Sequence, residues 1–316
     1  MAQESNENSA VNKGPNFTYA YSYISVRHFD ELLASINTLD QEGKLSGHAV
    51  YRRYLEHVKY RMPEGFPDVQ SIIIMAVFNK PMLVDFYLND RKHEIMVPPQ
   101  YYDDGITEED LRSTVLNDII KNPGCKLERA RHVSLKLMAV RSGLGKYGRN
   151  NICYVDGMGS LLKLCAYFTD YQFGMDNWRE IRMMDVCEDC GICISECPTK
   201  CLSDKDFVID AGRCLTLYNE IEGEFPEWID PQAHNTLMGC MRCQLPCPAN
   251  QEALRRSSRF EDVTEEETKK ILDGRHDEEL VNSLSRKLRI FSPDDARDVL
   301  PLLQRNLRVL LLKAGI

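Results

Sequence analysis

Apolar residues recur along this chain with two periods, which together predict alternating helices and strands. A spacing of about three to four residues predicts helices in four segments, 26–39, 49–59, 106–120 and 127–141. The run SIIIMAVF at 71–78 is apolar and β-branched enough for a buried strand. Residues 152–155 and 161–169 are also strand-like, and the glycine-rich turn 156–159 between them predicts a hairpin. We therefore expect an α/β domain over residues 16–180.

The pattern becomes helical again after residue 255. Thr264 and Glu267 have the spacing of a capping box. Asp277 suits the start of a second helix, and Pro293 suits the start of a third. Pro301 should bend or restart that last helix, because proline lacks a backbone N–H. The sequence thus predicts a short C-terminal helical segment at 256–316.

Composition describes an ordinary soluble protein, with 43% hydrophobic and 28% charged residues among 316. Residues 1–15 are polar, and we expect a disordered tail there without a targeting signal. No apolar run reaches the roughly 18 residues of a membrane span, so we expect no membrane contact. The many unpaired cysteines suit a reducing environment, so we expect a cytoplasmic protein. The net charge of −9 does not favour a nucleic-acid partner, since proteins that bind a nucleic-acid backbone usually carry a basic surplus. A local run of basic residues within 121–149 leaves an anionic cofactor or RNA open.

Seven of the twelve cysteines fall into two runs that, with an eighth between them, are typical of iron–sulfur proteins. The first run is CxxCxxCxxxCP from residue 187, and the second is CxxCxxxCP from residue 240, with one cysteine between them. Three thiolates of a CxxCxxC loop can hold one cube, while a cysteine before proline ligates the neighbouring cube. One [4Fe–4S] cluster would then use Cys187, Cys190, Cys193 and Cys247. The other would use Cys197, Cys214, Cys240 and Cys243. We therefore expect a ferredoxin-like double [4Fe–4S] domain at 181–255 that transfers electrons.

Other interpretations of the cysteines are weaker. A disulfide framework suits short secreted chains, and two zinc knuckles would need four ligands in each local group. Cys153 and Cys165 lie in apolar, strand-like runs and are expected to be buried small hydrophobes. Cys125 is interpreted as a loop thiol, and Cys201, close behind the first run, is not assigned as a ligand.

Residues 143–148 match the pattern GxGxxG. A dinucleotide fingerprint follows a strand and opens a helix, whereas here a helix precedes the loop and a strand follows it. The plain alternative is a glycine stop at the end of a helix. Three glycines followed by Arg149 and Asn150 exceed what a stop requires, and they would let a large ligand approach the backbone closely.

Several of these motifs together resemble epoxyqueuosine reductases. The resemblance rests on residues 141–150, on Gly159-Ser160 and Phe168-Thr169-Asp170, on the cysteine runs, on 210–214, and on Leu303-x-Arg305-Asn306-Leu307. Reductive dehalogenases share the same plan. The resemblance implies a reductase-like domain that binds base-off cobalamin beside the two clusters. Its cradle would be formed by Gly143, Leu144, Gly145, Gly148, Arg149, Asn150, Gly159 and Ser160.

This resemblance implies a cobalamin-dependent iron–sulfur oxidoreductase. Electrons would enter from a ferredoxin or flavodoxin and reduce an unidentified small molecule or modified base. Two alternatives stay open: a non-catalytic dicluster electron carrier or corrinoid-handling protein, and a tRNA epoxyqueuosine reductase.

The chain departs from the family where a proton donor is expected. The family places a catalytic aspartate about a dozen residues before its glycine loop, and residues 128–133 of this chain contain none. A reductive cleavage needs an acid within hydrogen-bond reach of the developing anion. Tyr147 is our first candidate, since dehalogenases use a tyrosine. His132 and Glu128 come next, and Tyr101 and Tyr102 are a looser option.

Overall fold

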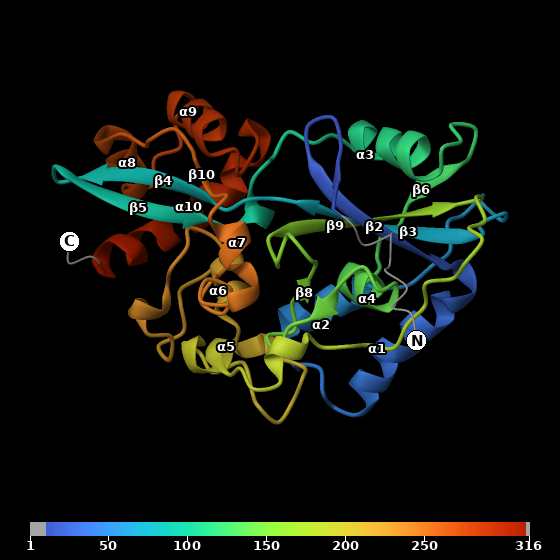
Figure 1. The fold of residues 1–316 in the computed structure, drawn as a ribbon. Helices are drawn as coiled ribbons and strands as arrows, with labels where there is room; N and C mark the ends of the chain where they lie inside the picture. Colours follow the sequence, from blue (N-terminus) through green and yellow to red (C-terminus); the bar gives the residue numbers. More distant parts are fainter. Residues whose placement is uncertain (1–10, 314–316) are drawn as a thin grey trace. The chain divides into compact units, whose positions relative to one another are not determined.

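The computed structural model describes residues 11–313, which form two compact units (Figure 1). The first unit contains the chain up to Phe78, Gly105–Gly191 and Lys205–Ala211. The second contains Asn79–Asp104, Ile192–Asp204 and the chain from Gly212 onward. Mixed α/β content is thus confirmed. These units are not divided at residues 180 and 255, where we predicted domain boundaries. Residues 79–104, for example, belong to the same unit as the C-terminal part of the chain.

The first unit is built on a five-stranded antiparallel sheet in the order β1-β2-β3-β9-β6. The strands are β1 (Asn12–Lys13), β2 (Thr18–Ser25), β3 (Ser71–Phe78), β9 (Leu162–Thr169) and β6 (Leu127–Arg129). The predicted strand at 71–78 is confirmed as β3, the central strand of this sheet. Almost all its side chains are buried, because the sheet is covered on both faces. Strand β1 begins within the predicted tail, of which residues 1–10 lie outside the described part of the chain.

Helices cover both faces of this sheet (Figure 1). Helices α1 (Phe29–Gln41) and α4 (Leu135–Arg141) pack with Ile72, Ile74 and Ala76 of β3. Helix α3 (Glu108–Thr114) continues into a π-helical turn, Val115–Ile119, which packs with the alternate residues of β3 on the other face. Helix α2 (Ala49–His57) is also present as predicted.

Two local predictions for the first unit were wrong. Residues 127–141 do not form one helix, because Leu127–Arg129 pairs with β9 and the chain then passes through His132 at φ +59° before α4 begins. Residues 152–169 do not form a hairpin. The turn 156–159 exists, with a bridge between Val155 and Gly159, but β8 (Cys153–Tyr154) pairs with β7 (Lys146–Tyr147) while β9 pairs with β3.

The second unit is built on a hairpin that the sequence pattern did not reveal. Strands β4 (Met82–Leu88) and β5 (Arg91–Val97) pair antiparallel, and β10 (Ser258–Arg259) joins β4 in parallel. Helices α8 (Glu265–Leu272), α9 (Glu278–Leu288) and α10 (Ala296–Lys313) lie beside these strands (Figure 1). Apolar side chains of the strands and of the helices share one core. Short helices α5 (Ile192–Glu196), α6 (Leu215–Glu220) and α7 (Gln251–Leu254) carry the cysteine-rich segment.

The predicted starts of the C-terminal helices are confirmed. Thr264 and Glu267 form a reciprocal capping box on α8, and the Asp277 carboxylate accepts the Leu280 N–H at the start of α9. Of the two outcomes predicted at Pro301, a bend or a restart, the restart is wrong because α10 runs through this residue as one helix. None of the helices between residues 11 and 313 is both long and apolar enough to cross a bilayer.

The capping carboxylate of Glu267 makes stability depend on pH. Burial alone would raise the pKa of Glu267, but hydrogen bonds from Lys287, Ser283 and Thr264 outweigh it and lower the pKa to about 2, from an ordinary value of 4.5. A group whose pKa is depressed in the folded state contributes stability above its unfolded pKa and loses it as the pH falls toward the folded value. We expect this contribution to be full at pH 7 and to disappear between about pH 5 and pH 2.

A comparison of urea unfolding between wild type and Glu267→Gln at pH 7, 5 and 3.5 checks this expectation. The difference between the two proteins should shrink as the pH falls, and losses that both proteins share cancel in that difference. A difference that stays constant with pH would contradict it.

Candidate iron–sulfur centres

Cysteine thiols from distant parts of the sequence meet in the second unit. Cys197 follows α5, Cys214 caps α6, and Cys240 follows the turn at Gly239. The Cys240 thiol lies close enough to Cys197 and Cys214 to interact with both electrostatically. Three of the four ligands predicted for one cluster are therefore brought together.

Hydrogen bonds from the C-terminal helix hold the loops that carry these thiols. The Asn306 side chain in α10 donates to the carbonyls of Asn219 and Leu237, both at 3.0 Å. Arg305 donates to the Tyr218 carbonyl at 2.7 Å. Asn219 in turn donates to the Gly239 carbonyl at 2.6 Å, directly before Cys240. The Arg305-Asn306 motif thus positions the cysteine-bearing segments.

The arrangement fits a cluster better than a single metal ion. Among residues 11–313, no three His, Cys, Asp or Glu side chains lie close enough to share one ion. A [4Fe–4S] cube does not require this, because each thiolate binds a different iron. Side-chain donors also face the sulfurs, with the Asn235 amide 3.2 Å from the Cys240 Sγ. Such donors are typical around cluster ligands.

The remaining predicted ligands are divided between the two units. Cys187 and Cys190 belong to the first unit, and Cys193, Cys243 and Cys247 belong to the second. In the first unit, the Arg149 guanidinium donates to the Cys187 carbonyl at 2.7 and 3.1 Å. Arg149, which we expected to bind a cofactor, thus anchors the loop that carries Cys187.

The glycine loop is held by the chain itself. It begins where α4 ends, and Gly143 has φ +70°, which favours glycine. A Cβ on Gly145 would lie 2.6 Å from the Tyr154 carbonyl oxygen, and one on Gly148 would lie 2.5 Å from the Tyr154 ring. These glycines are needed because β8 packs closely against the loop, which itself contains β7.

Other residues of the predicted cradle also make contacts within the chain. The Asn150 amide donates to the Tyr154 hydroxyl at 2.9 Å, and Leu144 belongs to the core of the first unit. Gly159 closes the turn after β8, and Ser160 is buried. Hydrogen bonding, core packing and the turn therefore give these residues structural roles within the chain. The cobalamin cradle stays a prediction, through which we derive no step.

The three predicted proton donors differ in their surroundings. Tyr147 is 4% exposed, and burial raises the pKa of its phenol, which keeps it protonated at neutral pH. Glu128 is exposed on the edge strand β6, and His132 is exposed in the turn before α4. Of the three, only Tyr147 lies within the glycine loop. The buried thiols Cys153 and Cys165 are confirmed as core residues, each 3% exposed.

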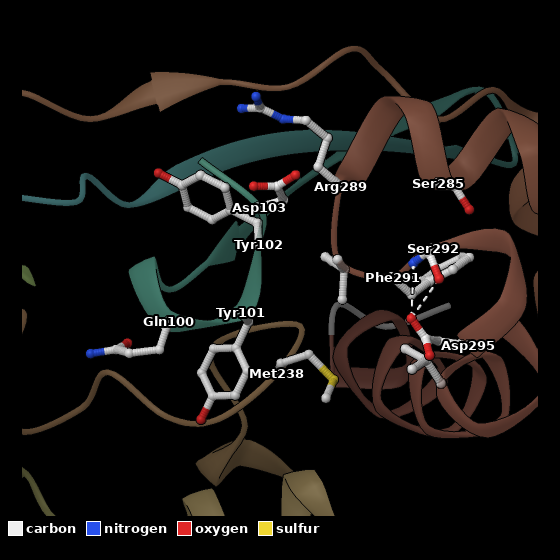
Figure 2. A pocket seen from close by; sticks show the side chains of 12 residues that line it. Gln100, Tyr101, Tyr102, Asp103, Met238, Ser285, Arg289, Phe291, Ser292 and Asp295 are labelled. Carbon is white, nitrogen blue, oxygen red and sulfur yellow. Dashed lines mark hydrogen bonds between the residues drawn. The ribbon is translucent and has the colours of Figure 1, made fainter. Parts of the chain in front are cut away.

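The second unit also contains a cavity of about 550 Å³, which Figure 2 shows with its lining side chains. Tyr101 and Tyr102, our looser candidates, both line it. The Tyr101 hydroxyl donates to the Glu220 carboxylate, and burial followed by this carboxylate raises the pKa of Tyr101 above its usual range. Cys214 and Cys240 contribute in the same direction, so Tyr101 lies near the cluster thiols. The Tyr102 hydroxyl instead donates to the Lys80 carbonyl at 2.7 Å.

Comparison with protein families supports the assignment of the cysteine-rich segment. Residues 186–250 match the family model described as a 4Fe-4S double cluster binding domain. Epoxyqueuosine reductases are similar over part of the chain. The protein from Shewanella oneidensis is 31% identical over 117 residues, which is 37% of this chain and 28% of that protein. The Aliivibrio fischeri protein is 35% identical over 117 residues, 37% of this chain and 30% of that protein. The matched region thus spans less than a third of these relatives.

Solved structures match over nearly the whole chain. Epoxyqueuosine reductase from Streptococcus thermophilus superposes with a TM-score of 0.67 over 98% of this chain and 79% of that one, at 18% identity. An epoxyqueuosine reductase solved with an epoxyqueuosine-modified tRNA stem loop gives a TM-score of 0.59 over 96% of this chain and 78% of that one, also at 18% identity. The chain is epoxyqueuosine reductase-like in its fold and in its double-cluster domain.

Proposed function

We propose that this protein is an iron–sulfur reductase of the epoxyqueuosine reductase type. Two [4Fe–4S] clusters within residues 186–250 would pass electrons to a substrate. The observation that carries this proposal is the meeting of Cys197, Cys214 and Cys240 inside a segment that matches the double-cluster model. Electrons would enter from a ferredoxin or flavodoxin, since these are small carriers suited to a cluster acceptor.

Epoxyqueuosine in tRNA is the substrate that we propose to test first. The similar proteins are named for its reduction, and one was solved with a modified tRNA stem loop. The negative net charge of the chain led us to disfavour a nucleic-acid partner. Net charge describes the whole chain, however, and binding of tRNA needs only a local basic surface. An unidentified substrate is thus the less economical interpretation.

An electron carrier without substrate chemistry of its own is the second candidate. One observation favours it: two of the three acids that we predicted, Glu128 and His132, are exposed on an edge strand and a turn. A proton donor in reductive chemistry works best where water is excluded. Tyr147 meets that condition, and it therefore decides between a catalyst and a carrier.

The test is anaerobic. We would measure iron and sulfide in the reconstituted full chain, titrate it with hydroxocobalamin by absorbance, and assay reduction of epoxyqueuosine-modified tRNA with a chemical reductant. About eight irons, four from each cluster, together with turnover would support the proposal. About eight irons without turnover on any offered substrate would favour the carrier. Iron well below this value would overturn both.

Replacement of Tyr147 by phenylalanine is expected to reduce turnover by about a hundredfold, because it removes the only phenolic proton in the glycine loop while keeping the ring. Tyr167→Phe is a matched control. It also removes a buried phenol, but one that donates to Glu108 beneath the sheet. Turnover of tRNA, measured per folded enzyme, should fall for the first variant only. Full activity of Tyr147→Phe would exclude this tyrosine and move attention to Tyr101.

A further inference from the structure

A fifth thiol lies among the ligands predicted for the second-unit cluster. Cys201 is 7% exposed, and its Sγ lies 3.4 Å from the Cys197 Sγ. It also hydrogen-bonds the Cys214 thiol. All three cysteines belong to the second unit. Cys201 thus touches two predicted ligands that are 17 residues apart in the sequence, a coincidence that needs a reason.

The chemistry of the site gives the direction of these hydrogen bonds. A cysteine that ligates iron is a thiolate, which has no proton and can only accept. The cube already has four predicted ligands, so Cys201 is left as a neutral thiol with one proton. That proton can be donated to the sulfur of Cys197 or Cys214. Cys201 is therefore the donor, and the two ligands are the acceptors.

Other side chains act in the same way around this cluster. The Thr199 hydroxyl lies 3.7 Å from the Cys197 Sγ, and the Thr216 hydroxyl bonds the Cys214 thiol. The Asn235 amide donates to the Cys240 Sγ. Among these donors, Cys201 alone reaches two ligand sulfurs. Its removal would therefore take away one donor that either of the two ligand sulfurs can use.

We propose that Cys201 is a positioning and tuning residue, whose single S–H donates to the Cys197 or the Cys214 ligand sulfur and raises the reduction potential of the cluster that they hold. The inference rests on the proposed cluster in the second unit. Reduction adds negative charge to the cluster and its sulfurs, and a hydrogen bond stabilises the more negative state more strongly. Loss of this donor should make the cluster harder to reduce.

The experiment is a potentiometric titration of the holoprotein followed by electron paramagnetic resonance, with iron content measured on the same samples. Cys201→Ala should keep about eight irons while the signal of this cluster moves to a more negative potential. At a fixed poise, the ratio of reduced to oxidised cluster should fall about fivefold, the effect of one hydrogen bond of about 1 kcal/mol. Cys201→Ser keeps a donor and should lie closer to wild type.

Matched variants make each outcome decisive. Cys165→Ala removes another buried thiol, in β9, and should leave the potential unchanged. If Cys201→Ala does not fold, Cys201→Val fills the volume without a donor and carries the same test. An unchanged potential would overturn the inference, and so would the loss of about half the iron, because Cys201 would then be a ligand. A wild type without clusters would overturn the proposed function itself, which iron content reveals separately.

Discussion

Cys240→Ala is expected to lose one cluster and to lower bound iron from about eight to about four per chain. Cys240 supplies one thiolate of the set that includes Cys197 and Cys214. The hydrogen bonds described above for the Cys201 thiol go to Cys197 and Cys214, so Cys201 is not placed to replace Cys240. An iron left without its protein thiolate is exposed to solvent and is lost. Electron transfer to substrate should then fall to background, since one of the two clusters is missing.

Iron and sulfide analysis with electron paramagnetic resonance checks this result. Cys165→Ala serves as the control, because it removes a buried thiol from the sheet of the first unit and should retain all the iron. The signal that disappears in Cys240→Ala also identifies which resonance belongs to the second unit. Retention of all the iron by Cys240→Ala would show that our ligand set is wrong.

Gly145→Ala is expected to destabilise the first unit by about 1–3 kcal/mol, the usual cost of inserting a carbon into a packed site. The new Cβ would lie 2.6 Å from the Tyr154 carbonyl oxygen and 2.8 Å from the Cys153 Sγ. The carbonyl belongs to strand β8 and cannot rotate away, so the β7–β8 ribbon must shift.

The matched control is Gly174→Ala, where an added Cβ meets no atom within 4 Å. Urea unfolding should separate the two variants, with a lower free energy of unfolding for Gly145→Ala only. Nearly normal stability of Gly145→Ala would contradict this packing role, and a hydroxocobalamin titration of the same variant tests the cofactor cradle separately. One variant measured in both ways thus separates the two roles of the loop.

Local patterns predicted the elements that depend on local chemistry. Residues 71–78 were recognised as a strand because a run of β-branched residues is buried on both faces of the sheet. Thr264 and Asp277 were recognised as helix starts because their side chains satisfy backbone N–H groups a few residues away. Such interactions are complete within one segment of sequence.

Predictions failed where a distant segment decides the conformation. Leu127 was assigned to a helix because it lies in register with Val133 and Leu137, yet its partner is Thr169 of β9. The hairpin β4–β5 was missed, although Asn89 and Asp90, both at positive φ, gave a turn signal. Asp85 interrupts its apolar pattern, and only the structure shows that Arg259 and Lys92 pair with that carboxylate.

In the candidate site, too, the features set by local spacing were predictable from the sequence, and those set by distant segments were not. The cysteine spacing predicted the double-cluster class, because ligand spacing is a local requirement. The cofactor role of the loop glycines stays a prediction, while their close packing against Tyr154 is visible only in the structure. The cysteine spacing assigns no role to Cys201, although a further cysteine four residues after Cys197 is the available signal.

The hairpin of residues 82–97 has a consequence for how the protein is made. During synthesis it leaves the ribosome long before β10 and the helices between residues 265 and 313, which complete its core. In the first unit, the edge of β3 that pairs with β9 stays unpaired until β9 has been synthesised. Neither unit can therefore be produced by cutting the gene at one point. Any shortened version that stops before residue 258 would expose the apolar face of this hairpin to chaperones and proteases.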